Sequence, residues 1–101
     1  MMNLVLIVNA SVQQAVTDHL RELDVPGFSV SPVQGHDYSS AQDRVLSARD
    51  RVVGFIPRVR VDVLLPADRV DAVLGALCDA DTGLSGHGTF WVSPVERFGQ
   101  F

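Results

Sequence analysis

The sequence predicts an α+β domain of the ferredoxin-like type, in which a four-stranded antiparallel sheet carries two helices on one face. Two observations support this prediction. A strand–helix–strand pattern occurs twice along the 101 residues, and the second strand of each unit contains the same four letters, Val30-Ser31-Pro32-Val33 and Val92-Ser93-Pro94-Val95. A chain of this length forms one domain, so residues 1–101 are treated as a single unit.

The first unit begins with a continuous apolar run, Leu4 to Val8, which is typical of a central strand buried on both faces. Ser11 and Gln14 then form a capping-box pattern at the start of a helix. Apolar side chains and one histidine follow at helical spacing: Val12, Ala15, Val16, His19, Leu20 and Leu23. Pro26-Gly27 ends the helix, and residues 28–33 predict the second strand.

The second unit repeats this order. After Pro57 the alternation is strict, with Val59, Val61, Val63 and Leu65 on one face and Arg58, Arg60 and Asp62 on the other. Asp68 is a candidate helix cap. An apolar helical stripe follows, formed by Val70, Val73, Leu74, Leu77 and Cys78. The last strand alternates Phe90, Val92 and Val95 with Trp91 and Ser93.

Two helices cover only one face of such a sheet. The other face would leave Leu6, Trp91 or their neighbours exposed, which predicts that the sheet packs against copies of itself. His19 and Cys78 lie on helical stripes, so we expect a core or interface histidine and a small buried hydrophobe rather than a reactive thiol. We expect Trp91 to pack.

Composition and charge exclude several classes of function. Hydrophobic residues make up 47% and charged residues 20% of the chain, as in an ordinary globular protein. The run Leu4 to Val8 is too short to span a bilayer and has no secretory leader, so we expect a cytoplasmic protein without membrane insertion. The single cysteine excludes an internal disulfide framework. A net charge of −4 argues against nucleic-acid binding.

Basic side chains are concentrated between residues 41 and 60. Five arginines and two acidic residues give this segment a local charge of +3, so the remainder carries −7. All eight basic residues of the chain are arginine, which makes bidentate contacts to phosphate or carboxylate groups. No periodicity persists from Gln34 to Gly54, and a connection of about twenty residues in a compact domain favours a functional segment.

The glycine-rich stretch Thr82 to Val92 is the strongest candidate for a ligand loop. Gly83, Gly86 and Gly88 permit positive φ and allow backbone N–H groups to converge on an anion. The alternative is a plain turn that ends the helix before it.

Three segments together resemble the PII signalling superfamily, and the resemblance covers nearly the whole chain. Residues 55–63 resemble its third strand, residues 80–92 its B-loop, and Gly27-Phe28-Ser29-Val30 leading to Gly35-His36 the entry to its long T-loop. The pattern is closest to a divergent PII-like branch that is associated with heavy-metal efflux systems.

The resemblance implies a trimer of ferredoxin-like subunits that binds an adenine nucleotide, such as ATP, ADP or AMP, in clefts between subunits. Carried over residue by residue, it implies a ligand site formed by Gly35, His36, Arg58, Gly86, His87, Gly88 and Thr89. The segment 35–54 would contact a partner, a membrane transporter or efflux component. Its candidate contact residues are Tyr38, Arg44, Arg49 and Arg51.

The chain also departs from the family pattern. His87 and Thr89 stand where a typical B-loop has Asp and Lys, and only Arg97 remains in place of the terminal arginines. His36 and His87, beside Asp37, leave open a divalent-metal site shared between subunits in a CutA-like architecture. The alternative is that these histidines only make hydrogen bonds or contact a ligand as neutral rings. No nucleophile–base set or spaced carboxylate pair is present, so we expect neither an enzyme nor a required cofactor.

Overall fold

The structure is a computed structural model, in which residues 1–35, 56–79, 84 and 88–101 are described. They form the strands β1 (Met2–Asn9), β2 (Phe28–Gly35), β3 (Ile56–Leu65) and β4 (Gly88–Pro94), and the helices α1 (Gln13–Glu22) and α4 (Val70–Asp79). Short 3₁₀ turns, η1 (Ala10–Val12) and η2 (Ala67–Arg69), lead into the two helices. Two strand–helix–strand units therefore follow one another, as predicted.

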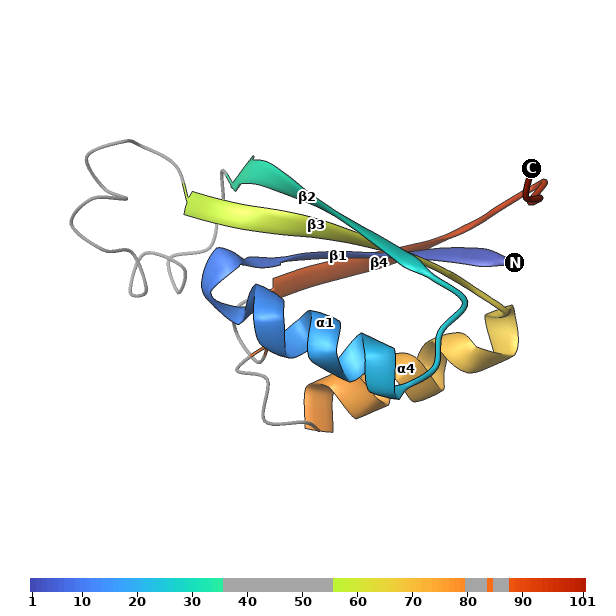
Figure 1. The fold of residues 1–101 in the computed structure, drawn as a ribbon, viewed down its shortest axis with the longest axis horizontal. Helices are drawn as coiled ribbons and strands as arrows, with labels where there is room; N and C mark the ends of the chain where they lie inside the picture. Colours follow the sequence, from blue (N-terminus) through green and yellow to red (C-terminus); the bar gives the residue numbers. More distant parts are fainter. Residues whose placement is uncertain (36–55, 80–83, 85–87) are drawn as a thin grey trace.

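The described strands form one sheet in the order β2-β3-β1-β4, and every neighbouring pair is antiparallel. Both helices lie on one face of this sheet (Figure 1). The arrangement confirms the predicted ferredoxin-like fold. It places β1 and β3 in the centre and leaves β2 and β4 as the two edges.

The hydrophobic core lies between the sheet and the helices. The sheet contributes Leu4, Leu6, Val8, Val59, Val61, Val63 and Leu65, and the helices contribute Val16, Leu20, Val70, Val73 and Leu77. The predicted alternation of β3 is confirmed, because its valines face the helices. The open face of the sheet, opposite the helices, carries Arg58, Arg60 and Asp62 from β3 and Val5 from β1.

The prediction that Leu6 is exposed on the open face was wrong. Leu6 is 2% exposed and belongs to the helix-facing core, whereas Trp91 does lie on the open face, across β1 from Asp62. The apolar run of β1 has no polar alternation, so only the register with β3 decides which of its residues face the helices. Val5 is fully buried on the opposite face, which confirms that β1 is buried on both sides.

Both helices begin through a 3₁₀ turn, so the predicted caps were wrong. Ser11 lies inside η1, and no side chain caps α1 at Val12. Gln14 instead donates a hydrogen bond to Asp18 at 2.8 Å. At the second helix Pro66 takes the capping position of η2, without a side-chain hydrogen bond, and Asp68 lies within the turn.

Two residues of the predicted stripes lie outside the core. Cys78 is exposed, which corrects the expectation of a buried thiol. It follows the buried Leu77 and is therefore turned by about 100° around the helix axis, away from the sheet. The His19 side chain is 33% exposed and lies 3.5 Å from the Glu22 carboxylate, so it is not a core residue in one subunit.

Candidate ligand-binding site

Arg58 and Gly35 are predicted ligand-binding residues, and the structure brings them into contact at one end of the sheet. Arg58 lies opposite Val33 of β2 and Asn9 of β1, and it is only 4% exposed. A Cβ added to Gly35 would lie 2.5 Å from Arg58 Cδ. Glycine at the end of β2 therefore makes room for the arginine side chain at the entry to segment 36–55.

A groove of about 430 Å³ opens beside Arg58. Its walls come from the start of α1 and from the facing ends of β2 and β3, and its polar side chains are Gln13, Gln34 and Arg58. Amide and guanidinium donors can hydrogen-bond an anion such as a phosphate or carboxylate. The predicted affinity of this region for anions thus has a physical basis in the described residues.

Gly88 and Thr89 lie at the same end of the sheet as Arg58. Gly88 is opposite Val8 of β1, and Val8 is in turn opposite Val59 of β3. A Cβ added to Gly88 would lie 3.1 Å from both the Leu84 and the Val8 side chains, so close packing alone accounts for this glycine. Thr89 is exposed.

The remaining predicted residues lie outside the described part of the chain. They are His36, Tyr38, Arg44, Arg49, Arg51, Gly86 and His87. Among the residues that are described, no group of three or more His, Cys, Asp or Glu side chains is placed to hold a metal ion. The metal hypothesis, which depends on His36 and His87, stays a prediction.

An ion pair occupies the middle of the open face. The Arg60 guanidinium donates to both Asp62 oxygens, at 2.9 and 3.0 Å, and lies 5.8 Å from the centroid of the Trp91 ring. Asn3 Nδ2 donates to Asp62 Oδ1 at 3.3 Å. These bonds from Arg60 hold the pKa of Asp62 below its ordinary value, against the opposing effect of burial. The bond to Asp62 raises the pKa of Arg60.

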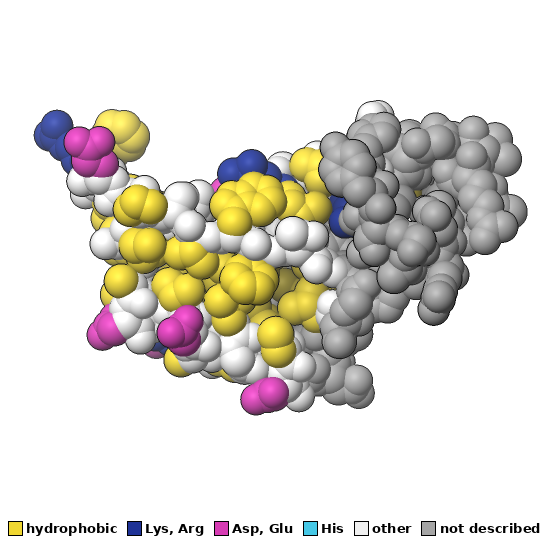
Figure 2. Space-filling model, turned by 180° about the vertical axis from the view of Figure 1, so that it is seen from behind, with side chains coloured by type: hydrophobic (Ala, Val, Ile, Leu, Met, Phe, Trp, Pro, Cys, Tyr) yellow, Lys and Arg dark blue, Asp and Glu magenta, His cyan; other side chains and the backbone are white. Residues whose placement is uncertain are grey.

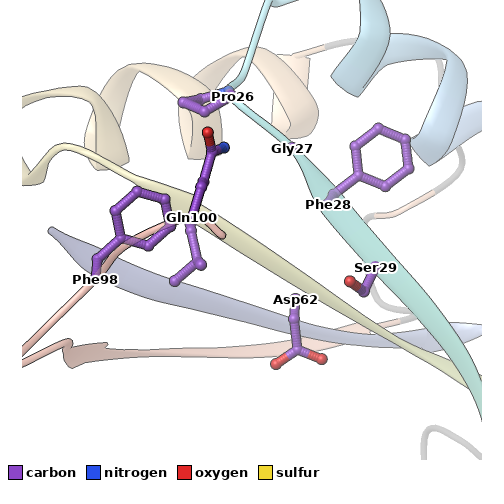
Figure 3. A pocket seen from close by; sticks show the side chains of 8 residues that line it. Pro26, Gly27, Phe28, Ser29, Asp62, Phe98 and Gln100 are labelled. Carbon is purple, nitrogen blue, oxygen red and sulfur yellow. The ribbon is translucent and has the colours of Figure 1, made fainter.

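A second groove, of about 320 Å³, lies on the same face at the other end of β3. Figure 3 shows Phe98 and Gln100 of the C-terminal segment on one side of it and the start of β2, with Gly27 and Ser29, on the other. The sequence did not predict this groove, because the C-terminal segment was treated only as a short end. Two phenylalanines, Phe98 and Phe101, lie within the last six residues, and this was the sequence feature that could have indicated an apolar surface there.

The two grooves lie near opposite ends of β3, the first beside the start of α1 and the second on the open face of the sheet. Asp62, which lines the second groove, follows Arg58 by four residues, a distance of about 13 Å along an extended strand. Arg60 lies between them and is already paired with Asp62. The first groove therefore contains a guanidinium group, and the second has apolar walls with hydroxyl, amide and carboxylate groups.

Comparison with known proteins extends these observations. A family model described as "Protein of unknown function (DUF3240)" matches residues 1–101. Relatives named nitrogen regulatory protein P-II, from Cereibacter sphaeroides and Rhizobium meliloti strain 1021, are 32% and 31% identical, and P-II 1 of Escherichia coli K12 is 28% identical. Each alignment spans 83 residues, 81% of this chain and 74% of the relative.

A solved structure shares the fold. The crystal structure of a DUF3240 family protein from Shewanella baltica OS155 has a TM-score of 0.73 and 22% sequence identity to this chain. The alignment covers 99% of this chain and 94% of that one. Among the described residues, no helix is long and apolar enough to cross a membrane.

Proposed function

The chain belongs to the DUF3240 family and, with the P-II relatives, to the PII superfamily of regulatory proteins, and we propose that it is a homotrimeric regulator of this type that binds an adenine nucleotide. The observation that carries the proposal is the buried Arg58 packed against Gly35 at the entry to segment 36–55. A phosphate that binds the Arg58 guanidinium can change the position of Gly35 and therefore the conformation of the segment that follows it.

The groove beside Arg58 supports a specific placement of the phosphates. We propose that the phosphates bind near Arg58, in the groove between the start of α1 and the facing ends of β2 and β3. A guanidinium suits the phosphates because it makes charge-assisted hydrogen bonds to their oxygens.

Regulation requires that the nucleotide binds one state of segment 35–54 better than another, since equal affinity would shift nothing. We propose that this segment contacts a partner, a membrane transporter or efflux component, through Tyr38, Arg44, Arg49 and Arg51. The role is regulatory rather than catalytic. Gly35 and Arg58 are the described residues through which the bound phosphate would act on the segment.

Titration calorimetry with ATP, ADP, AMP and adenosine tests the nucleotide proposal. The Arg58→Ala variant should lose about tenfold or more in affinity for ATP and ADP and much less for adenosine, because only the phosphates use the guanidinium. The Gly35→Ala variant should show the same pattern, since its methyl group displaces Arg58. Arg21→Ala removes an equal charge from the exposed side of α1 and should bind as the wild type does.

Two results would contradict this proposal. If every ligand at millimolar concentration gives neither heat nor a thermal shift, the chain does not bind an adenine nucleotide. Equal losses for ATP and adenosine in Arg58→Ala remove the assignment of the phosphates to this arginine.

A further inference from the structure

We infer that the groove beside Arg58 selects a nucleotide that ends in a single phosphate, so that AMP binds more tightly than ADP or ATP. This inference rests on the proposed function, because it specifies which adenine nucleotide the chain binds. It is carried by the side chains that line the groove. Among the described residues they are one guanidinium, two neutral amides and otherwise apolar groups.

Arg58 supplies the positive charge of the groove. Its side chain is 4% exposed, and it packs against Gly35 at the end of β2. A guanidinium that is largely removed from water attracts an anion more strongly than one at the surface. Its planar fork can form two parallel hydrogen bonds to two oxygens of the same phosphate. A single phosphate group therefore matches the fork.

The two amides are neutral donors that come from different elements. Gln13 is the first residue of α1, and Gln34 is the next-to-last residue of β2. Each amide has two N–H donors but carries no charge. The terminal phosphate of AMP has a third oxygen that the fork does not occupy, and an amide N–H suits it. The guanidinium and the amides together match the three terminal oxygens of one phosphate group.

The remaining walls of the groove are unfavourable for further phosphates. They come from side chains such as Pro32, Pro57 and Val59, which have no hydrogen-bond donor. An ionised group that leaves water for an apolar surface loses its hydration without gaining a partner. ADP and ATP bring additional charged phosphates into the groove. Among the described residues that line it, no second cation compensates for this charge.

The described surroundings do not replace the missing cation. Thr89, which stands where the PII pattern has a lysine, is neutral and exposed. Arg60 already donates two hydrogen bonds to Asp62. Arg97 precedes Phe98, which lines the groove near the other end of β3. Figure 2 shows one side of the molecule, on which hydrophobic side chains occupy the middle and basic side chains appear only in small separate areas.

Titration calorimetry of the full chain with AMP, ADP and ATP measures the order of affinities. AMP should bind about tenfold more tightly than ATP, because the added phosphates lose hydration without gaining a charged partner. Mg²⁺ should narrow this difference, since it neutralises part of the charge of ATP. A difference that Mg²⁺ leaves unchanged would show that shape rather than charge sets the order, and it would overturn the charge argument.

A variant that adds charge gives a test that a folding defect cannot imitate. Gln34→Arg places a second guanidinium in the groove and should raise the affinity for ATP about tenfold, with a much smaller gain for AMP. The matched control is Gln14→Arg, which adds the same charge to α1 at a residue that bonds to Asp18 and does not line the groove. It should keep the wild-type order of affinities.

The amides are tested by removing one of them. Gln13→Leu keeps a side chain of similar size but has no donor, so it should weaken AMP binding by about threefold to tenfold. Gln14→Leu, the same substitution at the next residue, should bind AMP as the wild type does. Thermal unfolding should show that all four variants are folded. Equal losses in the two leucine variants would contradict the assignment of Gln13 to the groove.

The outcomes separate this inference from the proposed function. If ATP binds more tightly than AMP, the inference is overturned and the proposed function stands. Equal gains in Gln34→Arg and Gln14→Arg would also overturn the inference alone, because the added charge would then act without entering the groove. If no nucleotide gives heat, the proposed function fails and the inference fails with it.

Discussion

Arg60 illustrates how single residues on the open face depend on one another. Its two hydrogen bonds to Asp62 and its position over the Trp91 ring join three side chains into one unit. This unit connects β3 with β4, which are not neighbours in the sheet. Asn3, on the strand between them, adds a third contact to Asp62. This unit borders the groove beside Phe98, because Asp62 lines it, so we expect the unit to keep the open face along β3 in a fixed shape.

The ion pair predicts how stability depends on pH. Arg60 lowers the folded-state pKa of Asp62, so the stabilisation is fully present above the ordinary aspartate pKa and is lost as pH falls through the lowered value. Asp62→Asn should therefore be less stable than the wild type at pH 7. The difference should shrink on acidification below about pH 4, in the range where aspartate titrates. Urea unfolding at several pH values measures it.

The matched control is Asp18→Asn. Asp18 pairs with Arg21 in a more exposed position, where both side chains are over half exposed, and such pairs contribute little. We expect a much smaller change at pH 7. A stability difference for Asp62→Asn that stays constant down to pH 2, below the aspartate titration range, would contradict the assignment.

At the scale of elements, two glycines show how context decides the effect of one substitution. Gly75 lies within α4 with nothing within 4 Å of an added Cβ, so Gly75→Ala should raise the free energy of unfolding by about 1 kcal/mol. Gly88→Ala should lower it by roughly 1–3 kcal/mol, because its methyl group would press on Val8, Leu84 and the Ile7 carbonyl. Denaturant unfolding of the two variants compares them, and the same sign for both would refute this account.

The end of α1 is tied to the second half of the chain. Asp24 turns the chain with a φ of 54°, and Arg69 of η2 donates to the Leu23 carbonyl at 2.8 Å and to the Asp24 carbonyl at 3.3 Å. Arg69 thus satisfies carbonyls that the helix leaves free at its C-terminus. It also links the two strand–helix–strand units.

Arg69→Ala should lower the free energy of unfolding by about 1–2 kcal/mol, since it removes charge-assisted hydrogen bonds to two carbonyls. Arg69→Lys should recover only part of this loss, because an ammonium group does not reproduce the fork of a guanidinium. Thermal unfolding checks both, with the exposed Arg97→Ala as control. If Arg97→Ala lowers the free energy of unfolding as much as Arg69→Ala does, the hydrogen bonds of Arg69 to the end of α1 make no specific contribution to stability.

At the scale of the whole molecule, assembly should couple to stability. If folded copies associate as proposed, the melting temperature rises with protein concentration, because association stabilises the folded state by mass action. We expect this rise for the wild type. Differential scanning fluorimetry over a hundredfold range of concentration measures it. A concentration-independent wild type would contradict the coupling.

Much of the fold could be predicted because the relevant signals are local. The alternation in β3 and the repeated Val-Ser-Pro-Val string led to the correct strands and order. Gly35 and Arg58 were assigned to one ligand site only through the family resemblance, and their direct contact was not predicted. The helix caps at Ser11 and Asp68 were predicted wrongly, because a short motif does not reveal that a 3₁₀ turn takes the place of a capped first turn.

The sequence by itself therefore determined the fold class, the helix stripes and the family, since periodicity and motif order are properties of neighbouring residues. Only the tertiary structure decided that Leu6 faces the helices, that Cys78 is exposed, that Arg60 is fixed between Asp62 and Trp91, and that the C-terminal segment forms a groove with β2. Each of these depends on the register between strands distant in sequence or on the orientation of a helix against the sheet. A periodic pattern specifies neither the register nor the orientation, because it is a property of one element and carries no information about the strand or helix that packs against it.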